Sequence, residues 1–280
     1  MHVSVRQLER ITGGRLRCDH VVSLGAPVIG RVVTDSRTVE PGDLFWALPG
    51  TVQDGADYIG EAIARGACGV VTQRKGEADP SGCTWRLEVD NALQALWTTA
   101  GWYRRELRGK SIAVTGSVGK TTTRNMIHTV LSTRLAGRQS LRNYNNQVGV
   151  PLSLLAADPL DDYGVWELAA SAPGEIGPLA ELVAPEIGVL TTIGDAHLAG
   201  FGSVRTVAAT KGELLDRLPS SGWAVLNGDD PWQQRMARRT LAKVVKVGRG
   251  GHCDLVANDV HWQPGQLEFT LDGLRFHETQ

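Results

Sequence analysis

A short glycine-containing loop carries the clearest chemical signal in the sequence, which reads Thr115-Gly-Ser-Val-Gly-Lys-Thr-Thr122 after an apolar stretch. Gly116 and Gly119 leave the backbone uncovered, so consecutive N–H groups and the positive end of a following helix can face phosphate oxygens. Lys120 would reach the β- and γ-phosphates of a nucleotide, and the Thr121 hydroxyl would face its magnesium ion. The loop is shorter than the usual G-x-x-x-x-G-K-[ST] pattern, but it predicts a nucleotide phosphate site. An ordinary strand-to-helix turn with a solvated lysine is the alternative.

Polar side chains follow three further apolar stretches. Glu167, His197 and Asn227 each lie at or just after such a stretch. If these stretches are parallel strands, their carboxyl ends share one edge of the sheet with the glycine loop. Glu167 and His197 then become candidate magnesium ligands, although histidine suits this ion less well than oxygen does. A helix cap, an ion pair or a structural histidine remains the alternative for each residue taken singly.

Composition limits the class of protein. The chain has 280 residues, 42% of them hydrophobic, and a formal net charge of −1, which predicts a globular protein without broad attraction to nucleic acid or anionic membranes. No apolar run is long enough for a membrane span, and the N-terminus lacks the layout of a signal peptide. The four cysteines form no C-x-x-C pair, so we expect reduced thiols and a cytoplasmic location.

The elements that would position these residues form two groups, and both predict an α/β fold. Residues 1–90 alternate short helices with β-branched runs bounded by glycine and proline, which predicts a small α/β domain. Asn91 could cap a helix that runs through Leu107. From Lys110 onward, strands and helices alternate, which predicts a parallel sheet covered by helices. We therefore expect domains at 1–90 and 91–280, with the glycine loop in the second.

The chain resembles the Mur ligases, the ATP-dependent amide ligases of peptidoglycan precursor synthesis and cell wall biogenesis. Residues 115–122 are similar to the family's short P-loop, and Asp35-Ser-Arg37 looks like part of its UDP-sugar-binding domain. Asn143-Tyr-Asn-Asn146, Pro173-Gly-Glu-Ile176 and Gly194-Asp-Ala-His-Leu198 look like the branch that joins D-alanyl-D-alanine to UDP-N-acetylmuramoyl-tripeptide. The resemblance covers essentially the whole chain and implies an N-terminal UDP-MurNAc-binding domain followed by a central P-loop ATPase domain.

The resemblance also implies roles for individual residues. ATP would contact Gly116, Ser117, Gly119, Lys120, Thr121, Thr122, Asn145, Asn146 and Asn227. Thr121 and Glu167 would share one Mg²⁺, and His197 would bind a second one near the attacking carboxylate. Turn or cap geometry is the alternative for the three asparagines. In the first domain, Ser36 and Arg37 would bind the uridine diphosphate, because a guanidinium can fork onto phosphate oxygens. A structural Asp35–Arg37 ion pair is the alternative.

Lys211 aligns with the lysine that becomes carbamylated in Mur ligases, so we expect Lys120, His197 and Lys211 to be the catalytic residues. A carbamate converts a cation into an anion that can support a metal. Its formation needs a neutral amine, and therefore a depressed pKa in a partly desolvated site. A surface lysine paired with Glu213 or Asp216 is the alternative.

The implied activity is ligation through an acyl phosphate, formed when the substrate carboxylate attacks the γ-phosphorus of ATP and then consumed by the incoming amine. Full Mur ligases have a third domain, and this sequence stops about where that domain should begin. We therefore expect the UDP-sugar and ATP sites to persist and ligation to be severely impaired. The alternatives are the branch that acts on the UDP-linked dipeptide, a non-catalytic module that needs a third domain in trans, and the folylpolyglutamate synthetases.

Overall fold

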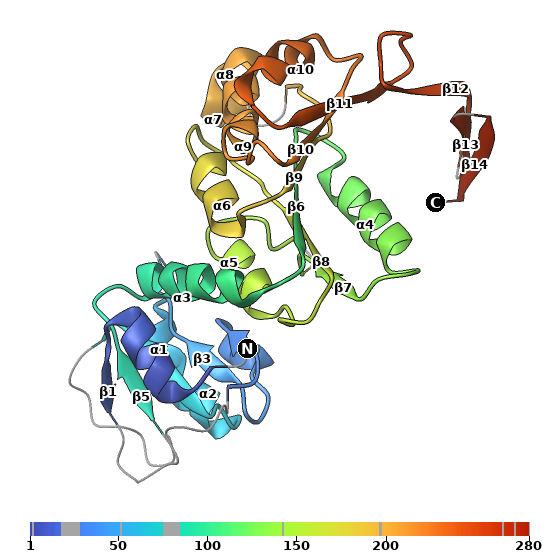
Figure 1. Ribbon diagram of the computed structural model, residues 1–280. Coiled ribbons are helices and arrows are strands. Elements are labelled where there is room, and N and C mark those ends of the chain that lie inside the picture. The colour runs from blue at the N-terminus through green and yellow to red at the C-terminus, as the bar shows by residue number, and fades with distance from the viewer. Residues whose placement is uncertain are drawn as a thin grey trace. The chain divides into compact units, whose positions relative to one another are not determined.

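The computed structural model describes residues 1, 3–17, 29–50, 52–74, 85–141, 143–195, 198–264, 266–271 and 273–279. His197 lies outside these residues. The chain folds as two compact units, shown in Figure 1. Unit 1 comprises residues 1–108 and 147–161, and unit 2 comprises residues 109–146 and 162–280. The part of the chain that the structure describes contains no helix long and apolar enough to cross a membrane.

Unit 1 contains a mostly parallel sheet of order β1-β5-β4-β3-β2, in which β1 runs antiparallel to β5. Its strands are β1 (Arg15–Arg17), β2 (Val32–Val33), β3 (Leu44–Trp46), β4 (Gly69–Thr72) and β5 (Arg86–Glu88). Its helices are α1 (Val5–Thr12), η1 (Ser36–Thr38), η2 (Gly55–Tyr58), α2 (Ile59–Ala64), α3 (Ala92–Glu106) and α5 (Gly149–Leu155). Phe45 and Val70 lie in the core between the sheet and α2. The small α/β domain predicted for the N-terminal residues is confirmed.

Helix α3 begins where the sequence predicts, because the Asn91 side chain accepts a hydrogen bond from Gln94 N at 2.9 Å. Its apolar face lies inside unit 1. Trp46 Nε1 donates to Ala92 O at 2.8 Å, and the Tyr103 hydroxyl donates to Ala157 O at 2.9 Å, next to α5. These contacts explain why unit 1 includes α3 and residues 147–161, whereas the sequence predicts a domain boundary at residue 90.

Unit 2 contains a sheet of order β14-β13-β12-β11-β10-β9-β6-β8-β7. Its strands are β6 (Lys110–Thr115), β7 (Gly137–Gln139), β8 (Tyr163–Glu167), β9 (Ile187–Leu190), β10 (Trp223–Asn227), β11 (Lys243–Gly248), β12 (Leu255–Gln263), β13 (Gln266–Leu271) and β14 (Leu274–Thr279). In this spatial order, all neighbours from β12 through β6 to β7 pair in parallel. The pairs β12–β13 and β13–β14 are antiparallel. The predicted parallel α/β architecture is confirmed, with an antiparallel extension at one edge.

Helices cover both faces of this sheet: α4 lies on one side and α6 on the other (Figure 1). The helices of unit 2 are α4 (Lys120–Leu131), α6 (Ile176–Val183), α7 (Leu198–Phe201), α8 (Val204–Lys211), α9 (Glu213–Asp216), α10 (Pro231–Met236) and η3 (Ala237–Arg239). Val114 and Val165 are fully buried in the core, and Ile127 and Leu131 of α4 pack against it. The sheet therefore holds β6, β8 and β9 side by side, with their carboxyl ends at one edge.

Candidate functional site

The glycine loop connects β6 directly to α4, as the sequence predicts. Gly116 has a φ of +149°, and a Cβ atom there would overlap Thr191 Oγ1, so this position accepts only glycine without rearrangement. Gly119 has a φ of +85° and is the N-cap residue of α4, whose first turn carries no side-chain cap. The N-cap residue of this 12-residue helix therefore gives its first N–H groups no side-chain cap, and this arrangement suits an anionic ligand.

The segment that follows β9 braces this loop. Ser117 N donates to Thr192 O at 2.8 Å, and Thr191 Oγ1 donates to Val118 O at 2.6 Å. The Ser117 hydroxyl also hydrogen-bonds to Gly194 O at 3.1 Å. Thr191 and Thr192 are not among the residues predicted from the sequence, although two threonines directly after a strand next to the loop strand were a usable signal.

Lys120 folds back over the loop. Its ammonium donates to Gly116 O at 2.9 Å and to Ser117 O at 3.2 Å. Burial lowers the pKa of Lys120, and the Glu167 carboxylate partly opposes this change. The ammonium thus lies within the loop, close to where the first turn of α4 would hold an anion.

Glu167 is the centre of a buried polar cluster, with only 2% of its surface exposed. Thr121 Oγ1 donates to its Oε2 at 2.8 Å, and Asn145 Nδ2 donates to its Oε1 at 2.9 Å. The Ser140 hydroxyl accepts a hydrogen bond from Glu167 N at 2.9 Å. The structure therefore brings together the two residues predicted to share a magnesium ion, together with one of the predicted asparagines.

Arg124, which is not among the residues predicted from the sequence, joins this cluster. Its Nη1 lies 3.3 Å from Glu167 Oε2, and both side chains are almost fully buried. Gln139 Oε1 accepts a further hydrogen bond from Arg124 Nε at 3.0 Å. The available signal was helical periodicity, because residues three apart on a helix share a face, and Arg124 follows Thr121 by three positions.

The oxygen atoms of Thr121 and Glu167 fit the ligand preference of a magnesium ion. The hydroxyl oxygen of Thr121 and a carboxylate oxygen of Glu167 are hard ligands, and they lie beside the uncapped helix end where phosphates would supply further oxygens. Thr122 follows Thr121 in the first turn of α4 and is exposed, and Asn146 follows Asn145 and is also exposed. The structure gives no geometry for His197, so its predicted role as a ligand and catalytic residue stays a prediction.

Lys211, at the end of α8, is buried and not a surface lysine. Only 3% of its surface is exposed, and its ammonium lies 5.6 Å from the centre of the Phe201 ring and 3.4 Å from Ala170 O. Burial and then the positive charge of Lys120 lower the pKa of Lys211 to about 8, against the opposing carboxylates of Glu175 and Glu213. The alternative of a surface ion pair is therefore wrong.

The predicted adenine residue Asn227 ends β10 and adopts the alternative geometry that the sequence left open. Its Oδ1 accepts a hydrogen bond from Asp229 N at 3.0 Å, an Asx-type turn. Asp230 then caps α10 and also accepts a hydrogen bond from Ile193 N at 3.1 Å. These contacts fix the end of β10 next to the segment after β9. A role in reading adenine stays a prediction.

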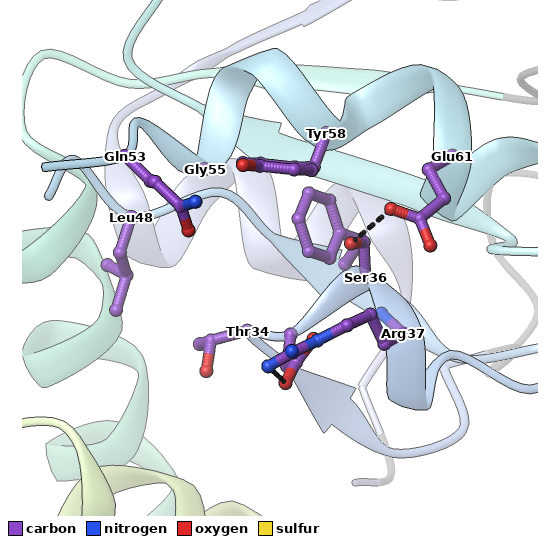
Figure 2. Close-up of a pocket in the computed structure, with 10 residues that line it drawn as sticks. Thr34, Ser36, Arg37, Leu48, Gln53, Gly55, Tyr58 and Glu61 are labelled. Atoms are coloured by element: carbon purple, nitrogen blue, oxygen red, sulfur yellow. Dashed lines mark hydrogen bonds and ion pairs between the residues drawn. The ribbon is translucent and has the colours of Figure 1, made fainter.

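Unit 1 contains a polar pocket around the predicted substrate residues. Its cavity of about 370 Å³ is of the size of small-molecule sites, and Figure 2 shows the side chains that surround it. It is lined by Thr34, Asp35, Ser36, Arg37, Phe45, Leu48, Gln53, Gly55, Tyr58 and Glu61. Ser36 and Arg37 were predicted from the sequence, but Glu61 was not; the Ser36 hydroxyl donates a hydrogen bond to it at 2.8 Å (Figure 2).

Arg37 pairs with Asp35, with Nη2 and Oδ2 2.7 Å apart and the arginine side chain 78% exposed. The hydrogen bond from Arg37 lowers the pKa of Asp35. An exposed pair of this kind contributes little to stability, roughly 0–1 kcal/mol. The guanidinium therefore keeps exposed N–H donors while it lines the pocket, and the Asp35 pair does not bury it.

The fold and these contacts define a class: a P-loop protein with a parallel α/β sheet, preceded by a smaller α/β unit. Two family models match the chain, the Mur ligase middle domain over residues 114–279 and the Mur ligase family catalytic domain over residues 28–96. The chain belongs to the Mur ligase family.

Individual relatives agree with this assignment. A curated UDP-N-acetylmuramoyl-tripeptide–D-alanyl-D-alanine ligase of Synechocystis is 36% identical over 247 residues, covering 88% of this chain and 53% of the relative. The crystal structure of MurF from Acinetobacter baumannii matches with a TM-score of 0.87 at 27% identity, over 99% of this chain and 60% of that one. MurF ligase from Thermotoga maritima in complex with ADP matches with a TM-score of 0.76 at 30% identity, over 89% and 58%. The chain thus spans about half the length of the curated relatives it matches.

Proposed function

We propose that this chain provides the ATP-binding and UDP-sugar-binding parts of a MurF-type ligase, which adds D-alanyl-D-alanine to UDP-N-acetylmuramoyl-tripeptide. The observation that carries the proposal is the 2.8 Å contact between Thr121 and Glu167 beside the uncapped N-terminus of α4. The names of the relatives supply the substrates, because curated proteins 34–36% identical to this chain are ligases for this tripeptide and D-alanyl-D-alanine. A cytoplasmic location is part of the proposal.

The chain's own residues would mainly hold and neutralise charge. Lys120 and the N–H groups of the loop would bind the β- and γ-phosphates of ATP, and Thr121 and Glu167 would hold Mg²⁺. An ion held there would supply positive charge to the phosphate oxygens. The substrate carboxylate would attack the γ-phosphorus, with ADP leaving and an acyl phosphate formed. Arg124 would orient the Glu167 carboxylate toward Thr121. His197 and Asn227 keep their proposed roles at the second metal and at the adenine.

Lys211 is proposed to carry a carbamate. The amine must be neutral to react with carbon dioxide, and a pKa of about 8 leaves roughly a tenth of it neutral at pH 7, compared with well under a thousandth at the ordinary 10.5. The carbamate would replace a buried positive charge beside Lys120 with a negative one. This exchange removes the repulsion that contributes to the lowered pKa of Lys211.

The pocket of unit 1 is proposed to hold the uridine diphosphate. Arg37 offers exposed donors for phosphate oxygens, and the Ser36 hydroxyl, which also lines the pocket, offers a further polar contact. A ligase for the UDP-linked dipeptide, of the MurE type, would use a similar pocket, and so would a module that only binds. The relative affinity for the UDP-linked dipeptide and tripeptide distinguishes a MurE-type ligase from a MurF-type one. An assay of ligation after mixing with a separately produced third domain tests for a module that only binds.

The test is the thermal stability of the 280-residue chain with the UDP-linked tripeptide, compared with the UDP-linked dipeptide. A ligand at 100 times its Kd adds about 2.7 kcal/mol, which shifts the melting temperature by a few degrees. We expect the larger shift with the tripeptide. Arg37→Met should abolish most of it without changing the melting temperature of the free chain, because the Asp35 pair is exposed.

The matched control is Arg6→Met, which removes an exposed arginine of the same unit paired with Glu9. This variant should keep the full shift. A larger shift with the dipeptide would favour the MurE-type ligase. No shift with either ligand, in a chain with a cooperative melting transition, would rule out the proposed substrate site.

A further inference from the structure

A second group of metal-ligating side chains lies at the same sheet, away from Glu167. Asp229 follows β10 through Gly228, and His252 and Cys253 lie in the turn between β11 and β12. Strands β10 and β11 are parallel neighbours, with Asn227 opposite Val247, so their carboxyl ends lie next to each other (Figure 1). One ligand atom from each of the three side chains lies within 4.8 Å of the others.

The distances are close to those of a coordinated metal. Cys253 Sγ lies 3.9 Å from Asp229 Oδ1. A tetrahedral zinc ion with Zn–S of about 2.3 Å and Zn–O of about 2.0 Å places sulfur and oxygen about 3.5 Å apart. The two side chains therefore need to move by only a few tenths of an ångström to share one ion. All three side chains are accessible, since Asp229 and His252 are exposed and Cys253 is half-buried.

The backbone already orients two of the three ligands. Arg249 N and Gly250 N donate to the Asp229 carboxylate at 2.6 and 2.9 Å, and these bonds lower the pKa of Asp229. His252 Nε2 lies 2.8 Å from Gly228 O and 3.3 Å from Gln234 Nε2. Because the carbonyl oxygen can only accept a hydrogen bond and its contact is the shorter one, we assign the proton to Nε2. The Nδ1 lone pair is then available. A histidine that donates one ring N–H to a carbonyl while the other nitrogen faces a metal is the usual arrangement of a zinc ligand.

Glycines leave the space between these groups. A Cβ on Gly250 would lie 2.7 Å from His252 Nδ1 and 2.9 Å from Asp229 Oδ1, so both ligand atoms face the same point. A Cβ on Gly248 would lie 2.7 Å from Asp229 Oδ2 and 2.9 Å from Cys253 Sγ, and one on Gly228 would overlap that sulfur. Side chains at these positions would separate the three ligands.

We propose that Asp229, His252 and Cys253 bind a zinc ion that joins the end of β10 to the turn between β11 and β12. Thiolate and imidazole ligands favour Zn²⁺ over Mg²⁺, which prefers oxygen ligands only. Three protein ligands leave a fourth position for water. The ion would fix Asp229, whose N–H already holds Asn227 at the end of β10. The thiol proton leaves to solvent when the Cys253 thiolate coordinates.

The test uses the reduced, metal-free 280-residue chain titrated with Co²⁺ and then with Zn²⁺. We expect one equivalent of Co²⁺ to give a thiolate-to-cobalt charge-transfer band and the visible spectrum of tetrahedral coordination. Zinc should displace it and raise the melting temperature by a few degrees. Cys253→Ser should abolish the charge-transfer band, and His252→Gln and Asp229→Asn should each weaken binding at least tenfold.

The sequence offers matched controls. Cys18-Asp-His20 carries the same ligand types, and Cys68 is another thiol. The Cys18→Ser/His20→Gln and Cys68→Ser variants should both bind one equivalent with an unchanged spectrum. The proposal is overturned if Cys253→Ser keeps the band, if the band depends on Cys18, or if the chain binds no cobalt at micromolar concentration. Should Cys253→Ser fail to fold, His252→Gln and Asp229→Asn decide the outcome. Because the probe is the metal alone, the result is independent of the proposed ligase function.

Discussion

Glu167 shows how single residues set the chemistry of this protein. A carboxylate with 2% exposure pays a large desolvation cost, and here Thr121, Asn145 and Arg124 offset it with hydrogen bonds and one opposite charge. The cost of breaking such a buried pair is typically about 3–5 kcal/mol. The arrangement therefore fixes a carboxylate oxygen next to the glycine loop, where the proposed nucleotide-bound cation would need a ligand.

Lys211 is the opposite case, a buried cation without a carboxylate in direct contact among the described residues. Its pKa is about 8 in the folded chain and about 10.5 in the unfolded chain. Between these values the unfolded chain binds more protons, so the free energy of unfolding should rise with pH in this window. Below pH 8 the buried charge destabilises the fold, and the cost disappears as pH approaches 10.5.

We therefore predict that Lys211→Met is more stable than the wild type at pH 7, measured by urea denaturation in buffer free of carbon dioxide. The stability difference between the two proteins should shrink by roughly 2–3 kcal/mol between pH 7 and pH 10. Lys243→Met, which removes an exposed lysine, should show no such change. A pH-independent difference for Lys211→Met would mean that the Lys211 amine titrates normally.

At the scale of elements, the turn from β6 into α4 depends on the strand next to it as much as on its own sequence. Gly116 has a φ of +149° at a point where the loop comes too close to Thr191 for a side chain to fit. Thr191 and Thr192 then form hydrogen bonds to the backbone of Val118 and Ser117. The short loop is stable in this form because the segment directly after β9 supplies partners for its backbone groups. Its geometry is therefore a property of β6, β9 and α4 together.

Gly116→Ala should weaken ADP binding at least tenfold and lower the free energy of unfolding by about 1–3 kcal/mol, the usual cost of a strained backbone position. The added Cβ would overlap Thr191 Oγ1 and push the loop away from β9. Calorimetric titration with ADP and magnesium measures the first effect, and urea denaturation measures the second. The control is Gly60→Ala, in α2 with open space around it. It should weaken neither ADP binding nor the stability of the fold. Unchanged ADP affinity in Gly116→Ala would contradict the proposed role of the loop.

The elements that sequence predicted well have strong local signals. The strand at 110–115 is an apolar run before a glycine loop, and α3 starts at an asparagine cap. Helix α5 was not predicted because all its residues are buried, so it has no polar face and no amphipathic period. Strand β12 was missed because a bulge between Asn258 and His261 breaks its alternation. Among the site residues, Thr121 was predicted from the loop motif and Glu167 from its place at the end of an apolar stretch. For Arg124 and Thr191 the sequence carried only a position on a helix or after a strand, and their partners Glu167 and Val118 become clear only from the tertiary contacts.

At the scale of the whole molecule, the order of residues along the chain differs from the order in which they pack. Residues 147–161 belong to unit 1, although 109–146 and 162–280 on either side belong to unit 2. Asn145 contacts Glu167 in unit 2, and only a few residues later α5 packs against α3 in unit 1. The segment that carries a predicted ATP contact is thus covalently continuous with the core of the unit that carries the UDP-sugar pocket.

This arrangement makes a prediction about stability. Leu154 of α5 and Leu226 of β10 are both buried leucines, with 0% and 2% exposure, but they belong to different units. Each change to alanine should cost about 2–5 kcal/mol. Leu154→Ala should lower the calorimetric melting transition that the UDP-linked tripeptide raises, and Leu226→Ala should lower the one that ADP with magnesium raises. If both variants lower both transitions equally, the two units unfold as one, and the assignment of α5 to a separately cooperative unit 1 fails. If Leu154→Ala lowers only the ADP-sensitive transition, α5 is energetically part of the nucleotide-binding unit despite its packing against α3.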